Sequence, residues 1–193
     1  MERNPDVDWS KVDDLIFGCA NQAGEDNRNV ARMAVLLSGM PINVPATTVN
    51  RLCGSGAQAI ASVAQSLMLG DADFGLAGGA ESMSRGPYIL PSMRHGAKMG
   101  DQQALDMMVG ALTDPMGTGH MGVTAENVAA EHQISRDEQD AFALESQSRA
   151  AAAIAQGRFK EQIVPVEVKT RKGVVSFDTD EHPKKTSAEA LGG

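Results

Sequence analysis

The chain has 193 residues, 42% of them hydrophobic and 22% charged, so it is long enough for one domain or two small ones. Its formal net charge of -8 argues against a nucleic-acid partner, because phosphate binding needs clustered Lys and Arg side chains. No stretch approaches the roughly 20 apolar residues that span a bilayer, and residues 1–9 lack the apolar core of a signal peptide. The two cysteines do not form a disulfide framework, and we expect a cytoplasmic protein with no membrane partner.

The first 80 residues alternate between strand and helix patterns. Three short apolar runs are typical of buried strands, and they lie at residues 15–19, 46–51 and 74–77. Two segments with helical spacing lie between them, each closed by a glycine, at residues 30–39 and 57–69. Residues 21–29 are polar and predict a loop. This βαβαβ order predicts a layered α/β sheet with helices on its faces.

The pattern changes from about Ser84 onwards. Residues 85–117 are rich in Met, Gly and Pro, and they predict an excursion with short helices. Residues 126–131 look helical, and Ser135 with Glu138 forms a capping box that predicts a helix through about residue 156. Two further runs predict a β-hairpin, at residues 163–169 and 174–177. We therefore expect an α/β domain at residues 1–83 and an α+β domain at residues 84–193.

Cys53 lies where a strand pattern ends and an Ala-rich helix pattern begins. A helix start offers unpaired N–H groups and the positive end of the peptide dipole, which favour thiolate over thiol. The glycines on either side of Ser55 leave room for a substrate to approach the backbone. Cys53 is therefore the candidate nucleophile, although a free cysteine is more often a buried apolar filler. Cys19 ends an apolar run with no helix after it, and we expect it to be such a filler.

Four segments carry a resemblance to a known family. Residues 49–56, VNRLCGSG, followed by residues 76–84, LAGGAESMS, resemble the nucleophile region of thiolases, in particular the acetyl-CoA acetyltransferase branch. Residues 119–127 resemble the coenzyme A loop of that branch, and residues 135–140 resemble the helix start that follows it. The resemblance implies an α/β fold with a thiolase-like layered mixed sheet, helices on its faces and an inserted α+β loop domain that binds coenzyme A.

The resemblance also implies an activity. It implies acyl transfer between acyl-CoA thioesters through an acyl-enzyme on Cys53, with acetyl-CoA or coenzyme A as substrate and no covalently bound cofactor. It places His120 and Met121 beside coenzyme A or its acyl end, Leu112 against the pantetheine, and Lys184 near the adenine nucleotide. It further implies a homo-oligomer, either a dimer or a tetramer.

The sequence departs from the family pattern at both ends. The resemblance implies that the first strand, expected inside the N-terminal sheet, and most of the first helix are missing. The Gly-His-Pro and Cys-x-Gly segments, which give thiolases their catalytic histidine and second catalytic cysteine, do not occur in these 193 residues. We expect the isolated chain to have little or no turnover. The alternative of a non-catalytic thiolase fragment or oligomerisation module therefore stays open.

A nucleotide-binding module is another alternative. Gly54, Gly56 and Ala59 lie between a strand and a helix and nearly match a dinucleotide fingerprint. The fingerprint needs an acidic residue after the next strand, whereas Asp71 and Asp73 precede that strand. The four histidines have no paired or zinc-like spacing, so we expect no metal site.

Overall fold

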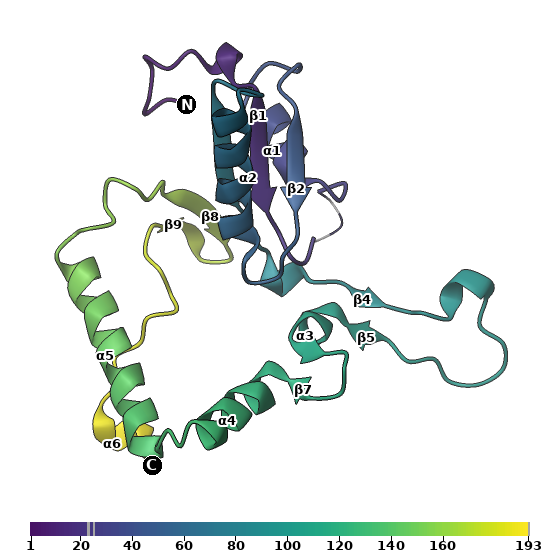
Figure 1. The fold of residues 1–193 in the computed structure, drawn as a ribbon, viewed down its shortest axis with the longest axis vertical. Helices are drawn as coiled ribbons and strands as arrows, with labels where there is room; N and C mark the ends of the chain where they lie inside the picture. The colour runs from purple at the N-terminus through teal and green to yellow at the C-terminus, as the bar shows by residue number, and fades with distance from the viewer. Residues whose placement is uncertain (23, 25, 193) are drawn as a thin grey trace. The chain divides into compact units, whose positions relative to one another are not determined.

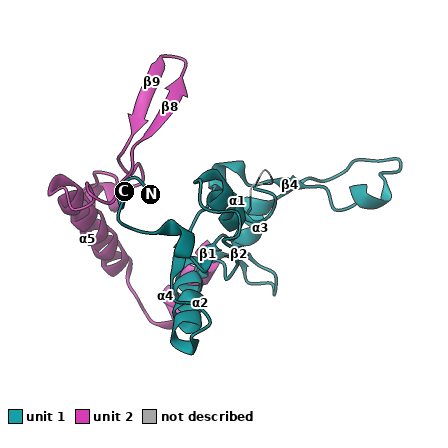
Figure 2. Ribbon diagram, turned by 90° about the horizontal axis from the view of Figure 1, so that it is seen from above, with its two compact units in different colours: residues 1–121 teal, residues 122–193 magenta. Residues whose placement is uncertain are grey.

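The computed structural model describes residues 1–22, 24 and 26–192. The chain forms two compact units, residues 1–121 and residues 122–193 (Figure 2). The predicted loop at residues 21–29 includes residues 23 and 25, which lie outside the described residues. The division expected after residue 83 concerns the domains of the family and stays a prediction.

The first unit is built on a three-stranded parallel sheet in the order β2-β1-β3 (Figure 1). The strands are β1 Asp14–Gly18, β2 Ala46–Val49 and β3 Gly75–Gly79. Leu15 of the central strand pairs with Ala46 on one side and with Leu76 on the other. The predicted α/β class is confirmed, and the three strands of this sheet are all parallel. They are direct neighbours, with no gap between them.

Two helices cover opposite faces of this sheet, α1 Val30–Leu37 and α2 Ser55–Leu69 (Figure 1). Successive residues of a strand point to opposite faces, so Leu15 packs in one cluster with Val35 of α1. Ile16 packs in a second cluster with Val63 of α2. Val35 has no exposed surface, and its full burial contributes about 1.5–3 kcal/mol. The sheet is therefore the middle layer of three.

Both helices of this sheet have a cap at one end, and the glycine that closes the second was predicted. The Asn29 side chain caps α1 by accepting a hydrogen bond from the Arg32 N–H at 3.1 Å. Gly70 ends α2 in the left-handed conformation, with φ of 77°, which a glycine adopts without steric cost. The helix begins two residues earlier than predicted, at Ser55 instead of residue 57.

The remainder of the first unit consists of short elements, as the sequence predicts for residues 85–117. Three 3-10 turns lie at η1 Trp9–Lys11, η2 Met83–Arg85 and η3 Met93–His95, and the short helix is α3 Met107–Ala111. Two antiparallel pairs are β4 Tyr88–Ile89 with β5 Leu105–Asp106, and β6 Thr113–Asp114 with β7 Gly119–His120. The strand pairs were not predicted, because two residues are too few for a periodic pattern.

The second unit contains the predicted long helix and hairpin. Its elements are α4 Met121–Glu131, which begins at the unit boundary, α5 Arg136–Ala155, β8 Val166–Thr170, β9 Gly173–Phe177 and α6 Ala188–Leu191. The capping box is confirmed, because Ser135 and Glu138 each accept a hydrogen bond from the other's N–H. Helix α4 begins five residues earlier than predicted. The sequence did not indicate the early start, because Gly122 and Val123 are weak helix formers. No helix among the described residues has the length and apolarity to cross a membrane.

A carboxylate joins the starts of two strands. The side chain of Asp13, just before β1, accepts hydrogen bonds from the N–H groups of Phe74 at 3.0 Å and Asp73 at 2.8 Å. These bonds, the one from Phe74 first, lower the pKa of Asp13. The ring of Phe74 in turn contacts Trp9, with centroids 6.5 Å apart. The fluorescence of Trp9, the single tryptophan, therefore reports on the packing of this unit.

Asp13→Ala is expected to lower the melting temperature of the first unit at neutral pH, measured by Trp9 fluorescence. A carboxylate with a lowered pKa adds stability above its unfolded pKa of about 3.9 and loses it as the pH falls through the folded value. The difference between the variant and the native chain should therefore shrink below about pH 4. Asp6→Ala is the matched control for the loss of one charge, and an equal change in both variants would contradict the role of Asp13.

Candidate functional site

Cys53 is exposed and lies two residues before the first residue of α2. It lies within a tight turn, in which the Gly54 N–H donates to the Arg51 carbonyl and the Ser55 N–H donates to the Leu52 carbonyl, both at 3.0 Å. The N-cap residue of α2 is Gly54, which has no side chain to occupy the first-turn N–H groups. The sulfur is therefore open to solvent at the positive end of a 15-residue helix.

The loops that follow all three strands are tied together at the same edge of the sheet. Asn50, just after β2, donates to the Ala20 carbonyl at 3.1 Å and accepts from the Leu52 N–H at 2.9 Å. Glu81, after β3, accepts from the N–H groups of Ala20 and Asn21, both at 2.8 Å. The carboxyl ends of parallel strands are where ligands bind in open α/β sheets. The turn that carries Cys53 is thus anchored to the rest of this edge.

Cys19 lies at this edge in the opposite environment. Its residue is 4% exposed, and its Sγ donates to Oε1 of Glu81 at 3.8 Å. Burial first, and then the negative charge of Glu81, raise the pKa of the Cys19 thiol. The prediction that Cys19 is a buried filler is confirmed, and Cys53 is the thiol that solvent can reach.

Three of the expected coenzyme A residues lie together in the first unit. The Leu112 carbonyl accepts a hydrogen bond from the Met121 N–H at 2.8 Å, and His120 pairs with Thr113 in the β6–β7 hairpin. Leu112 is half-buried, while the side chains of His120 and Met121 are exposed. The β6–β7 pairing thus brings Leu112 beside His120 and Met121, although Leu112 is eight and nine positions before them in the sequence.

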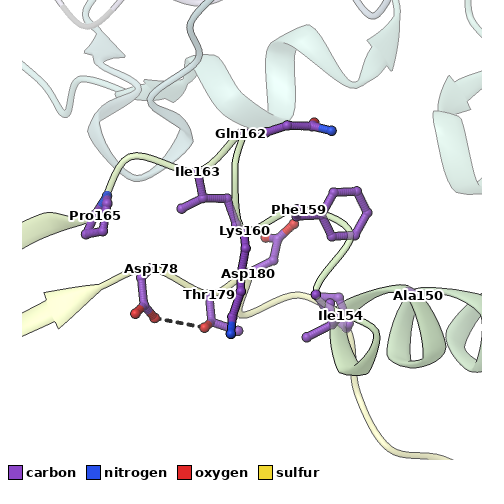
Figure 3. A pocket seen from close by; sticks show the side chains of 12 residues that line it. Ala150, Ile154, Phe159, Lys160, Gln162, Ile163, Pro165, Asp178, Thr179 and Asp180 are labelled. Atoms are coloured by element: carbon purple, nitrogen blue, oxygen red, sulfur yellow. Dashed lines mark hydrogen bonds between the residues drawn. The ribbon is translucent and has the colours of Figure 1, made fainter. Parts of the chain in front are cut away.

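Lys184 belongs to the second unit and is exposed. Its backbone N–H donates to Oε1 of Gln147 on α5 at 2.8 Å. Lys184 and Lys185 line a hollow of about 570 Å³ against this helix, together with Asp180. A second hollow of about 580 Å³ lies between α5 and the segment after it (Figure 3). Ile154, Phe159 and Ile163 line this second hollow, which contains none of the predicted site residues.

Glu81 and Asn50 were not singled out from the sequence. Asn50 follows β2 directly and Glu81 lies two residues after β3, where polar side chains meet at the edge of a parallel sheet. The signal in the sequence was therefore their place in the βαβ order and not a motif. Among the described residues, no group of three or more His, Cys, Asp or Glu side chains is arranged to hold a metal ion.

The arrangement does not favour a dinucleotide site. Asp71 and Asp73 lie before β3, and the Asp73 N–H is bound to Asp13. The acidic residue that follows β3 is Glu81, whose carboxylate already accepts two backbone N–H groups. A ribose would therefore compete with the bonds that hold this edge together.

Residues 1–193 match the family model described as thiolase, N-terminal domain. The chain belongs to the thiolase family. It is 57% identical over 176 residues to the beta-ketothiolase BktB of Cupriavidus necator, a match that covers 91% of this chain and 45% of the relative. It is 52% identical over 199 residues to a beta-ketoadipyl-CoA thiolase of Acinetobacter baylyi, with 99% and 49% covered. An acetyl-CoA acetyltransferase of Syntrophomonas wolfei is 48% identical over 184 residues, with 94% and 46% covered.

Solved thiolase structures agree with this fold. The Bacillus anthracis acetyl-CoA acetyltransferase superposes with a TM-score of 0.91 at 40% identity, covering 97% of this chain and 48% of that one. Human mitochondrial 3-ketoacyl-CoA thiolase gives the same TM-score and coverage at 41% identity. The chain spans about half the length of the curated relatives it matches. The family and the fold expected from the sequence are therefore confirmed.

Iodoacetamide is expected to alkylate Cys53 in the folded chain while Cys19 stays unmodified, because Cys19 is buried and its pKa is raised. Peptide mass spectrometry after a timed reaction measures both sites separately. Denaturant serves as the control, since it should expose both thiols to the reagent. Equal labelling of the two cysteines in the folded chain would contradict the environments described here.

Proposed function

We propose that this chain carries the nucleophile of an acetyl-CoA C-acetyltransferase, with Cys53 as the residue that accepts the acyl group. The observation that supports it is the exposed Cys53 at the start of α2, in a chain of the thiolase family. The relatives named above include both an acetyl-CoA acetyltransferase and beta-ketoadipyl-CoA thiolases. We therefore propose the acetyl group as the one transferred, since the names of the relatives do not agree on a single acyl group.

In the first step, the Cys53 thiolate attacks the carbonyl carbon of acetyl-CoA. A carbon–sulfur bond to Cys53 forms, the bond to the coenzyme A sulfur breaks, and coenzyme A leaves as a thiolate that takes up a proton. Negative charge develops on the carbonyl oxygen during the attack. The backbone N–H of Cys53, at the start of α2, is one donor to that oxygen.

In the second step, a second acetyl-CoA loses a proton from its α-carbon, and this carbon attacks the Cys53 thioester. The new carbon–carbon bond yields acetoacetyl-CoA and releases Cys53 as a thiolate; thiolysis runs the same steps backward. The base for this proton is not found in the 193 residues, which contain neither a Gly-His-Pro nor a Cys-x-Gly segment. Polypeptide equivalent to the other half of the relatives supplies it in this proposal.

Each unit contains residues that we assign to coenzyme A. Leu112 offers an apolar surface for the pantetheine, and His120 and Met121, which the β6–β7 pairing brings near Leu112, are assigned to coenzyme A or its acyl end. Lys184 and Lys185 give the hollow on α5 two positive charges against the single carboxylate of Asp180, which suits the phosphates of the ligand. In this proposal the protein is a cytoplasmic homo-oligomer, a dimer or a tetramer.

Incubation with acetyl-CoA is expected to add one acetyl group to the native chain, at Cys53, and none to Cys53→Ser. Steady-state cleavage of acetoacetyl-CoA should be at least about 100-fold slower than with a full-length relative, because several proton-transfer groups are absent. Mass spectrometry measures the first result and the loss of the acetoacetyl-CoA absorbance the second. Cys19→Ala is the control that should keep Cys53 acetylation, and acetylation of Cys53→Ser would reject the assignment.

Association through α2 is a second candidate function. None of the 15 residues of α2 is charged, yet its outer side exposes Ile60 at 62% and Met68 at 86%. Large apolar side chains exposed on an uncharged helix favour contact with another protein surface. Strand β3 also ends the described sheet, so its outer backbone groups have no strand beside them there. Both features favour contact with another polypeptide, either a second copy or a fuller thiolase chain.

Sedimentation velocity is expected to show the native chain as a dimer or larger species. Ile60→Glu and Met68→Glu should shift it toward the monomer, because a buried carboxylate in the contact is costly. Leu37→Glu, at a residue 87% exposed on α1, is the matched control and should keep the native sedimentation coefficient. A compact monomer for the native chain with a cooperative Trp9 melting curve would reject the association role.

A further inference from the structure

The backbones of β1 and α2 meet at Gly18. A Cβ atom on residue 18 would lie 2.5 Å from the carbonyl oxygen of Ser55 and from the nitrogen of Gly56. Cβ atoms in proteins essentially never come closer than 3.0 Å to another heavy atom. The obstructing atoms belong to the backbone, so they cannot rotate away as a side chain does. The first turn of α2 can therefore lie this close to the end of β1 only if residue 18 is a glycine.

Ser55 connects that contact to the turn that contains Cys53. The residue is 5% exposed, and its hydroxyl accepts a hydrogen bond from the Arg51 N–H at 2.9 Å and donates to the Leu52 carbonyl at 2.6 Å. Leu52 has a φ of 47°, a left-handed conformation that residues other than glycine adopt only where their surroundings hold them. A buried hydroxyl with both partners in one turn provides such a restraint.

We propose that Gly18 and Ser55 are positioning residues for Cys53, an inference that rests on the nucleophilic role proposed above. Gly18 allows α2 to begin directly against the sheet, and Ser55 fastens the turn at Arg51 and Leu52 to that beginning. Cys53 is thereby held directly before the first turn of α2, at the positive end of the helix dipole. Neither residue contacts the reacting atoms, and both act through the position of Cys53.

Site-resolved alkylation of the full chain by iodoacetamide tests this proposal. Ser55→Ala removes the hydroxyl without adding volume, and Ser66→Ala is its matched control, because that hydroxyl donates to the Ser62 carbonyl far along the same helix. Gly18→Ala adds a Cβ atom that the backbone of Ser55 and Gly56 obstructs. Gly75→Ala is its matched control, since its Cβ would lie 2.6 Å from Cγ1 of Val63 and would crowd α2 away from its start.

Alkylation of Cys53 near neutral pH is expected to slow roughly two- to fivefold in Ser55→Ala and at least as much in Gly18→Ala, the size of a helix-terminus interaction. The ratio of the rates with anionic iodoacetate and neutral iodoacetamide should fall as well, because the positive end of α2 attracts the anionic reagent only while Cys53 lies beside it. A change in access alone would instead scale both rates by the same factor. Gly75→Ala and Ser66→Ala should keep the native rates with both reagents, whatever happens to the Trp9 melting temperature.

Native alkylation rates for Ser55→Ala with both reagents, with Cys19 still protected, would overturn the proposal. Equal slowing in Gly75→Ala would overturn it too, because general loosening of α2 would then explain the effect. If Cys19 is labelled in Gly18→Ala, that variant is unfolded, and the result for Ser55→Ala alone decides whether the proposal holds. Acetylation of the native chain by acetyl-CoA is scored separately. If the native chain is not acetylated but alkylation is altered in Ser55→Ala, the acyl-transfer role is rejected and the positioning of Cys53 is still supported.

Discussion

The parallel pairing of β1 with both of its neighbours is the constraint on which the rest of the first unit depends. Because all three strands run in one direction, their carboxyl ends meet at a single edge, and the loops after them can bond to one another. Asn50 and Glu81 make those bonds from the two outer strands to residues that follow β1. The start of α2 then has one place to lie, which is against the end of the central strand.

The two cysteines show that the same side chain has different properties in different local environments. Cys19 follows β1 directly and is packed beside a carboxylate, so burial and charge both favour its neutral form. Cys53 follows β2 after a longer turn, and the turn carries its sulfur out to the start of a helix. A few residues of additional loop thus separate a buried thiol from an exposed one.

The sequence predicted the features that depend on local pattern. The strands, both helices of the sheet, the capping box at Ser135 and the exposed position of Cys53 follow from periodicity, glycine stops and the junction of strand and helix. The structure was needed for contacts between distant segments. No local pattern signals that Gly18 meets Ser55 or that Glu81 binds the loop after β1, since these pairs lie far apart in sequence. Two-residue strands also leave no period to detect.

The hairpin of β8 and β9 has consequences for how the molecule loses its structure. Every residue of both strands is exposed, and a two-stranded ladder by itself is at best marginally stable in water. The interior around Val35 lies at the other extreme, with side chains sealed from solvent. Such a chain unfolds in parts. The β8–β9 hairpin opens at a low free-energy cost, whereas the three-stranded sheet opens only when its whole core unfolds. A single unfolding free energy for all 193 residues would therefore average over unlike events.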